Sequence, residues 1–291
     1  MKRSLINLHL AVFLAGFTGV LGRLISLNES LLVWYRLLIT VITLLLLFLL
    51  RGSIPKISFK SVVRIFSVGA IVALHWVAFY GSIKYSNVSI ALVCFSTVGF
   101  FSALLEPVVL RKSIAVIELL LGMLPIAGVY CIFHFDTRYK NGIAFGIISA
   151  FLAALFTILN KKVLEKHEAG TVTLYELTGG FLILTLLLPA YLQFFDLRFV
   201  LPSANDWLWL IILSWLCTVL AFFLSLSALK KVSAFTVNLS YNLEPIYGIL
   251  LAFLIYHENK DLGISFYVGL SLIVIAVVVQ MSRVYRKQRL N

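Results

Sequence analysis

The chain has 291 residues, of which 62% are hydrophobic and only 12% are charged, and its formal net charge is +12. A soluble globular protein is about 45–50% apolar and about 25% charged, so this composition excludes an ordinary water-soluble domain and favours a chain that lies in a bilayer. The positive charge does not indicate a nucleic-acid-binding protein, because Lys and Arg stand in short clusters between apolar runs and form no basic stripe.

The apolar runs predict ten membrane-spanning helices, and thus an all-α, polytopic membrane protein. An α-helix needs about 20 mostly apolar residues to cross a hydrocarbon core about 30 Å thick. No small-x-small cleavage site follows the first run, so we interpret it as an uncleaved helix and not as a signal peptide. In chain order, the predicted spans are residues 5–23, 31–50, 62–83, 88–110, 115–134, 141–160, 172–194, 207–229, 234–256 and 263–282.

The distribution of Lys and Arg predicts which side of the membrane each loop faces. If the amino terminus is cytoplasmic, the basic clusters at 51–64, 161–166 and 283–289 all fall on the cytoplasmic side. Cytoplasmic loops carry the excess of Lys and Arg in membrane proteins. We therefore expect a multi-pass protein of the cell's inner (plasma) membrane, with both termini in the cytoplasm.

Two segments of the first half recur in the second half. "FLAGFTGVLGR" at 13–23 matches "FLAALFTILNK" at 151–161, and "WYRLLITVITLLLL" at 34–47 matches "LYELTGGFLILTLL" at 174–187. Because five is an odd number of helices, the second copy enters the bilayer from the opposite side, as in transporters built from inverted repeats.

The duplication predicts the domain organisation. We expect a first five-helix repeat at 1–135, a second at 139–283 and a basic cytoplasmic tail at 284–291. The fifth and tenth spans match more weakly, through Gly122 and Gly269. In transporters of this kind the binding site lies between the repeats, near the middle of the bilayer.

Glu244 and Pro245 stand near the middle of the ninth predicted span. A carboxylate at that depth costs about 2.5–3.5 kcal/mol on insertion scales, so it should face the bundle interior or a wet cavity. Pro245 cannot donate a hydrogen bond to the carbonyl of Tyr241, which frees that carbonyl and favours a bend. Glu244 is a candidate to bind substrate or to carry a coupling proton. The alternative is a protonated anchor that hydrogen-bonds a neighbouring helix.

Other residues at similar depth are candidates for the lining of a cavity. His75 is also a candidate proton carrier, because its charge changes near neutral pH, with a hydrogen bond to a neighbouring helix as the alternative. Arg36 and Glu176 are candidate gates near opposite faces, and snorkelling to the headgroups is the alternative for both. The candidate substrate-binding residues are Glu244, Asn242, Tyr241, Ser240, His75, Trp76, Tyr80, Ser96 and Thr97.

The segment 228–279 carries the features of a known family. It has a short hairpin, a helix with a central proline at Pro245, an acidic residue before the last helix at Glu258, and a glycine in that last helix at Gly269. On these features and the ten-span duplication, the chain resembles the EamA-like branch of the drug/metabolite transporter superfamily over nearly its whole length.

The first half departs from the family pattern, because Phe101 stands where the proline is expected and Pro107 comes later. The resemblance implies a secondary transporter that exports a small organic metabolite by alternating access, often against protons. Amino acids, purine-like compounds and amphipathic drugs are the substrate classes that it implies.

Two alternatives from other classes stay open, an intramembrane enzyme and a channel or non-transporting scaffold. "HENKD" at 257–261 lacks the second histidine of HExxH and no GxSxG motif occurs, so we expect no enzymatic activity. A channel would need rings of carbonyls or charges, and none is visible. We expect no metal or other cofactor, because Cys94, Cys131 and Cys217 lack metal-ligand spacing.

The expected partners are therefore the lipid bilayer, a small-molecule substrate and, if transport is coupled, protons. No nucleic-acid partner is expected. The sequence does not predict the oligomeric state.

Overall fold

The computed structural model describes residues 2–52, 54–111, 113, 115–135, 137–241 and 243–290. These residues form helices joined by short loops and contain no strand, so the predicted all-α fold class is confirmed. In chain order the elements are α1 (Lys2–Leu24), α2 (Glu29–Leu50), α3 (Phe59–Tyr85), α4 (Val88–Phe95), α5 (Val98–Leu110), α6 (Val116–Phe135), η1 (Thr137–Tyr139), α7 (Lys140–Val163), α8 (Ala169–Phe194), α9 (Ala204–Ser214), η2 (Trp215–Leu220), α10 (Ala221–Leu229), α11 (Ala234–Tyr241), α12 (Glu244–Tyr256), η3 (Glu258–Lys260) and α13 (Ile264–Leu290).

Several of these segments are long and apolar enough to cross a bilayer. By length and composition, the described residues contain eight such segments, which begin with Ser4–Leu24 and end with Ala204–Leu229. Two further apolar helices, Glu244–Tyr256 and Ile264–Val279, are shorter. The chain is thus a multi-pass membrane protein, and the count of ten spans stays a prediction.

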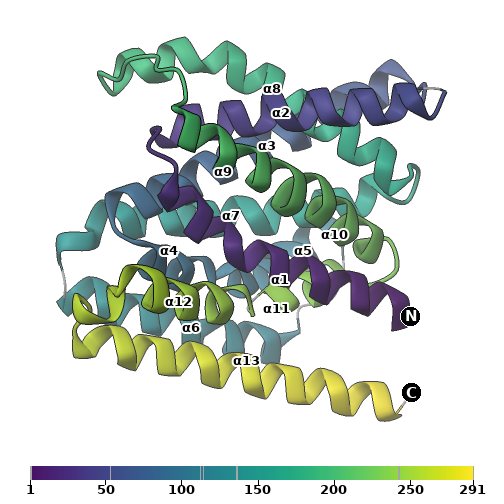
Figure 1. Cartoon of the computed structure of the whole chain (residues 1–291). Helices are drawn as coiled ribbons and strands as arrows, with labels where there is room; N and C mark the ends of the chain where they lie inside the picture. Colours follow the sequence, from purple (N-terminus) through teal and green to yellow (C-terminus); the bar gives the residue numbers. More distant parts are fainter. Residues whose placement is uncertain are drawn as a thin grey trace.

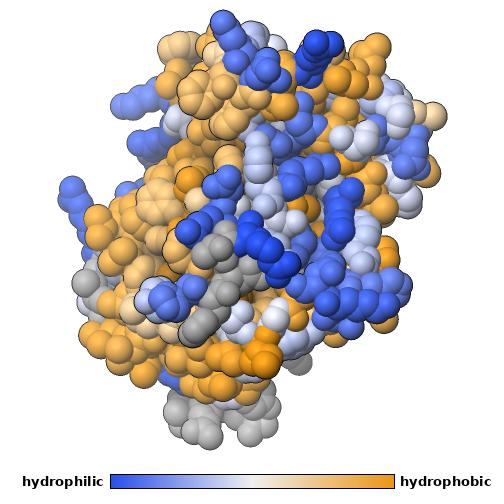
Figure 2. Space-filling model, turned by 90° about the vertical axis from the view of Figure 1, so that its left-hand side faces the viewer, coloured by the Kyte–Doolittle hydropathy of each residue, from blue (hydrophilic) through white to orange (hydrophobic). Residues whose placement is uncertain are grey.

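The helices form a bundle in which both chain ends lie at the same end (Figure 1). α3 packs against α7 and α8, α6 packs against α13, and α1 packs against α10 and α12. At the opposite end of the bundle, hydrophilic residues gather across the middle, and hydrophobic residues cover much of the surrounding sides (Figure 2). Large exposed side chains such as Leu50, Leu186 and Leu254 fit such a surface, because lipid is their natural solvent.

Two of the apolar segments are interrupted near their middle. α4 and α5 have 8 and 13 residues and are separated by Ser96 and Thr97. α11 and α12 also have 8 and 13 residues, and α11 ends at Tyr241 while α12 begins at Glu244. The expected bend at Pro245 is thus an interruption, because the proline stands in the first turn of α12, where its missing N–H has no helical partner to lose.

The close crossing of α6 and α13 depends on two glycines that face each other. A Cβ atom on Gly128 would lie 2.7 Å from the carbonyl oxygen of Gly269, and one on Gly269 would lie 2.7 Å from that of Gly128. Gly122, which matches Gly269 when the two halves of the sequence are compared, packs against the backbone of Phe100. Small residues at such a crossing let two helices approach closely in a membrane.

Candidate functional site

A cavity lies inside the bundle between the two halves of the chain. α1, α2, α3 and α4 line it from the first half, and α7, η2, α10, α11 and α12 line it from the second. Its volume is about 80 Å³. The lining runs from Thr18 and Glu244, deep in the bundle, to Leu229, the last residue of α10, at the end of the bundle where the termini lie.

Glu244 reaches this cavity from the start of α12. Its side chain is buried, and it lines the cavity beside Tyr241, the last residue of α11. In the part of the chain that the structure describes, no side chain or backbone N–H donates a hydrogen bond to the Glu244 carboxylate. A carboxylate in the first turn of a helix interacts favourably with the helix dipole, so α12 helps to stabilise this charge while leaving its oxygens facing the cavity.

Arg36 lines the same cavity from α2 and is almost fully buried, at 1% exposure. Its Nε donates to Thr218 Oγ1 at 2.6 Å, Nη1 to Tyr80 Oη at 2.9 Å, and Nη2 to the Cys217 carbonyl at 3.2 Å. The guanidinium also lies over the Trp76 ring, 3.9 Å from its centroid. The snorkelling alternative is wrong for Arg36, because the side chain turns into the bundle.

The π-helical segment η2 provides two of these acceptors. An α-helix bonds its carbonyls along its own axis, whereas a π-helical turn widens the backbone and is frequent at functional sites. Here Thr218 Oγ1 donates to the Leu213 carbonyl at 2.9 Å, and the Cys217 carbonyl faces Arg36. The sequence carries no signal for this segment, because "WLCTVL" has the composition of any apolar span.

His75 lines the cavity but is also bonded to a neighbouring helix. Its Nδ1 lies 2.9 Å from both the carbonyl oxygen and the hydroxyl of Ser149 on α7. The ring packs beside Phe79, Phe95 and Phe156. The contact with Ser149 is the hydrogen bond to a neighbouring helix that was the alternative for His75. The role of His75 in proton coupling stays a prediction.

The remaining predicted residues lie in different places. Trp76 lines the cavity. Tyr80 is buried and does not line the cavity, but its hydroxyl accepts a hydrogen bond from Arg36, which does. Ser240 is not part of the cavity lining, and its hydroxyl donates to the Thr236 carbonyl at 3.0 Å. Asn242 lies outside the described residues.

Ser96 and Thr97 are fully buried and do not line the cavity. Ser96 Oγ donates to the Val93 carbonyl at 2.6 Å, and Thr97 Oγ1 donates to the Cys94 carbonyl at 2.7 Å. These hydroxyls bond carbonyls three residues back, where the helix is interrupted. They shape the break between α4 and α5 instead of contacting the cavity.

Glu176 is fully buried on α8 and does not line the cavity, so snorkelling is wrong for it too. Asn160 Nδ2, whose residue does line the cavity, donates to Glu176 Oε1 at 2.8 Å. Glu176 Oε2 has no hydrogen-bond partner among the described residues. The candidate gating role of Glu176 stays a prediction. Sequence reasoning missed Asn160, because it stands near the end of its predicted span.

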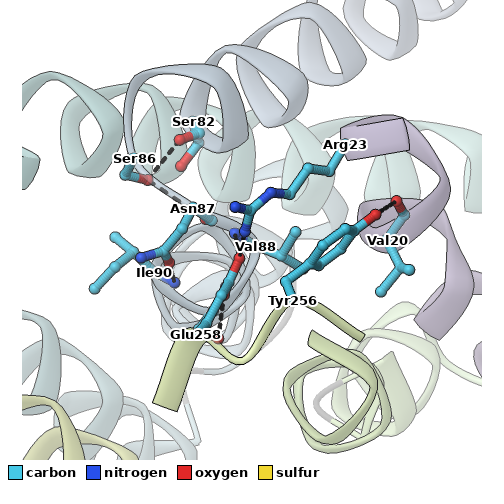
Figure 3. A network of polar contacts seen from close by, with 10 residues as sticks. Val20, Arg23, Ser82, Ser86, Asn87, Val88, Ile90, Tyr256 and Glu258 are labelled. Atoms are coloured by element: carbon cyan, nitrogen blue, oxygen red, sulfur yellow. Dashed lines mark hydrogen bonds and ion pairs between the residues drawn. The ribbon is translucent and has the colours of Figure 1, made fainter. Parts of the chain in front are cut away.

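A second polar cluster, which we call the clasp, lies at the end of the bundle opposite the termini (Figure 3). It consists of Arg23, Glu258, Tyr256 and the first residues of α4, Val88 and Ser89. The Glu258 carboxylate accepts the backbone N–H groups of Val88 at 3.1 Å and Ser89 at 2.8 Å and the Ser89 hydroxyl at 2.6 Å. It also forms an ion pair with Arg23.

The clasp joins three helices. Arg23 at the end of α1 lies over the Tyr256 ring, 4.3 Å from its centroid, and the Tyr256 hydroxyl donates to the Val20 carbonyl at 2.7 Å. Glu258 follows α12 and satisfies the free N–H groups at the start of α4, the role of an N-cap supplied from another helix. The ends of α1 and α12 and the start of α4 are thus held together.

An all-helical bundle with apolar sides and an internal cavity that holds a few charged and polar side chains has the architecture of a multi-pass membrane transport protein. The model of the EamA-like transporter family matches the chain twice, over residues 2–134 and 140–281. The chain therefore belongs to the EamA-like transporter family, of the drug/metabolite transporter superfamily, and is a membrane transporter. The resemblance seen in the sequence is confirmed.

Known relatives agree with this assignment, and a solved structure has the same fold. The uncharacterized transporter YetK of Bacillus subtilis is 26% identical over 285 residues, which cover 91% of this chain and 84% of YetK. An uncharacterized transporter of Synechocystis sp. is 31% identical over 129 residues, which cover 44% of this chain but only 36% of that relative. One crystal structure has the same fold, with a TM-score of 0.68 and 16% identity over 98% of both chains.

Proposed function

We propose that the protein is a secondary transporter that exports a small organic metabolite by alternating access through the internal cavity. The substrate classes are amino acids, purine-like compounds and amphipathic drugs. The observation that carries the proposal is the cavity, which is lined from both halves of the chain and holds a carboxyl group, Glu244, at an interrupted helix. Interrupted helices at the junction of two repeats are where such transporters bind substrate.

The proposal includes ten spans arranged as two inverted repeats, 1–135 and 139–283, with the tail 284–291 and both termini in the cytoplasm. Three observations support it. The two interrupted segments have equal lengths in the two halves. The family model matches each half separately. Both termini lie at the same end of the bundle, as an even number of crossings requires (Figure 1).

The proposed orientation, with both termini in the cytoplasm, also assigns the side of the membrane towards which the cavity extends. The lining of the cavity reaches Leu229 at the end that holds the termini, and no described residue of the clasp belongs to it. With the termini in the cytoplasm of a cell, the cavity opens inward and the clasp closes the outer side. In the proposed cycle the clasp opens and the inner end closes when substrate is released outside.

Glu244 either binds a positively charged group of the substrate or carries the coupling proton. A thermal-shift screen of amino acids, purines and amphipathic amines selects the solute, and its counterflow is then measured in proteoliposomes with and without a pH gradient. We expect Glu244→Gln to reduce uptake at least about tenfold, because an interaction of a charged group contributes about 1.5–3 kcal/mol. Glu106→Gln is the matched control. Glu106 also stands directly before a proline, Pro107, but it does not line the cavity.

The outcomes separate the two roles of Glu244. Loss of uptake in both conditions indicates substrate binding, and uptake that no longer responds to the pH gradient indicates proton coupling. Full, proton-coupled uptake by Glu244→Gln would exclude both roles. If no solute shows saturable counterflow with the unsubstituted protein, the transporter proposal itself is wrong.

A further inference from the structure

The guanidinium of Arg36 is a buried positive charge that has no carboxylate partner among the residues that the structure describes. It makes its three hydrogen bonds to a hydroxyl of Thr218, a hydroxyl of Tyr80 and a carbonyl of Cys217, all of them neutral groups. In the described part of the chain no Asp or Glu oxygen lies within 4.0 Å of it. Burial of an ion without a counter-ion is costly, so this charge requires another source of compensation.

The cavity is the place from which that compensation can come. A guanidinium has five N–H donors, and the three hydrogen bonds above leave one N–H free on each terminal nitrogen. Trp76 holds the guanidinium plane from one face through the contact at 3.9 Å. Arg36 borders the cavity, so its free donors can be reached by a molecule bound there. Two parallel N–H groups match the two oxygens of a carboxylate or a phosphate.

Glu244 does not neutralise this charge by direct contact. It borders the same cavity, but in the described part of the chain no hydrogen bond or ion pair joins it to Arg36. Part of the cavity therefore separates the guanidinium from this carboxyl group. A bound anion can take the place beside Arg36 that the protein's own carboxylate does not fill.

We propose that Arg36 is the anion-binding residue of the cavity and that the substrate carries a carboxylate or phosphate group which binds its guanidinium above Trp76. The identification of the bound anion as the substrate rests on the proposed function, but the binding of an anion at Arg36 does not require transport. The aromatic walls of the cavity, Trp76, Phe156 and Phe222, favour an anion with an apolar or aromatic body. A substrate that also carries an ammonium group would place it towards Glu244.

The test uses pairs of probes that share an aromatic body, one with an anionic group and one without it. Binding of benzoate against benzamide, and of phenyl phosphate against phenol, is measured on the purified protein in nanodiscs by calorimetry and by the shift in Tm. We expect the anionic member of a pair to bind and its neutral partner to bind at least about tenfold more weakly, as the loss of a charge-assisted contact predicts. A larger difference in affinity for the benzoate pair indicates a carboxylate site, and a larger difference for the phenyl phosphate pair indicates a phosphate site.

Variants then assign the binding to Arg36. Arg36→Gln should lower the affinity for the anion at least about tenfold, and Arg36→Lys should have a smaller effect, because it keeps the charge but loses the planar pair of donors. Arg64→Gln, which removes an exposed basic residue outside the cavity, should leave the affinity unchanged. Equal binding of the anion and its neutral partner, or unchanged binding in Arg36→Gln, would overturn the proposal.

A second variant keeps the test decisive if Arg36→Gln does not fold. Arg36→Lys keeps the buried positive charge but loses the planar pair of donors, so it should bind benzoate more weakly than the unsubstituted protein does, and unchanged binding would contradict the site. Saturable counterflow of a solute without any binding of anions would refute this inference and leave the proposed transport in place. Binding of anions that depends on Arg36, without counterflow of any solute, would refute transport and leave the site.

Discussion

The two interrupted segments, α4–α5 and α11–α12, have the same backbone plan. Each consists of a helix of 8 residues followed by one of 13. Each also ends in a residue with a left-handed conformation, Arg111 at φ 52° and His257 at φ 56°. Neither is a glycine, the residue that most often adopts this conformation. The likeness between these two segments thus extends to the residue that ends each of them.

The chemistry at the two interruptions differs. In the first, the hydroxyls of Ser96 and Thr97 bond carbonyls of their own segment and leave nothing ionisable. In the second, Glu244 places a carboxyl group at the cavity, and Pro245 begins the new helix. Both segments thus contain a helix break, whereas among the described residues only the second carries an ionisable group at its break.

The starts of the two segments also differ. α4 begins with a local cap, in which Asn87 Oδ1 accepts the N–H of Ile90 at 2.8 Å, and with the buried carboxylate of Glu258 in addition, which is paired with Arg23. α11 begins with a local cap, in which Ser233 Oγ accepts the N–H of Thr236 at 3.0 Å. Lys161, which matches Arg23 when the two halves of the sequence are compared, donates to the carbonyls of Leu229 and Val232. One end is thus held more firmly than the other.

The largest expected effect comes from removing the carboxylate of the clasp. Glu258→Ala leaves two N–H groups and the hydroxyl of Ser89 without their acceptor and Arg23 without its ion pair. We expect a loss of about 3 kcal/mol of unfolding free energy, since Arg23 is partly exposed and keeps some hydration. The measurement is the Tm of the purified protein, which should fall by several degrees.

Glu168→Ala is the matched control for that experiment. It removes the carboxylate of the ion pair between Glu168 and Lys230. This pair is exposed and lies at the end of the bundle opposite the clasp. An equal fall of Tm in the two variants would show that the two ends are held alike, and the comparison would then be wrong.

A second prediction separates the scaffold role of one break from the chemical role of the other. Thr97→Val removes one hydrogen bond in the first interruption, so it should cost about 1 kcal/mol of unfolding free energy and leave uptake intact. Glu244→Gln removes a buried charge, so it should keep or raise the Tm while uptake is lost. Tm and counterflow are measured on both variants, and loss of uptake in a stable Thr97→Val would contradict the division.

Much of the fold could be predicted from the sequence, because length and apolarity alone determine where a helix can cross a bilayer. Each of the ten predicted runs overlaps one helix or two or three consecutive helical segments. The sequence predicted a distortion at the second interruption, because Pro245 cannot continue the hydrogen-bond ladder of a helix. The first interruption had no such signal, because Ser96 and Thr97 are ordinary in membrane helices and Phe101 gave no reason to expect a break.

The cavity could be predicted only in part. Glu244, His75 and Trp76 were found from depth, because an ionisable or polar group in a span must avoid lipid. Depth does not tell which way a side chain points, and α2 is apolar on nearly every side, so Arg36 could equally have faced the headgroups. Its partner Thr218 depends on the π-helical segment, which the composition does not encode.

The smallest expected effect concerns the exposed ion pair between Glu168 and Lys230, which lies outside the spanning segments. The hydrogen bond from Lys230, at 2.6 Å, lowers the pKa of the Glu168 carboxyl. A lowered pKa contributes stability above the ordinary pKa of a glutamate, and this contribution is lost as the pH falls through the lowered value. Lys230→Gln should therefore change the Tm little at pH 7 in physiological salt, where exposed pairs are screened, and not at all once Glu168 is protonated. Thermal unfolding of Lys230→Gln and of the unsubstituted protein between pH 7 and pH 3 measures the difference. A difference that grows towards acid would mean that Lys230 acts through a group other than Glu168, and the looser end of the bundle would then hold an interaction comparable to the clasp.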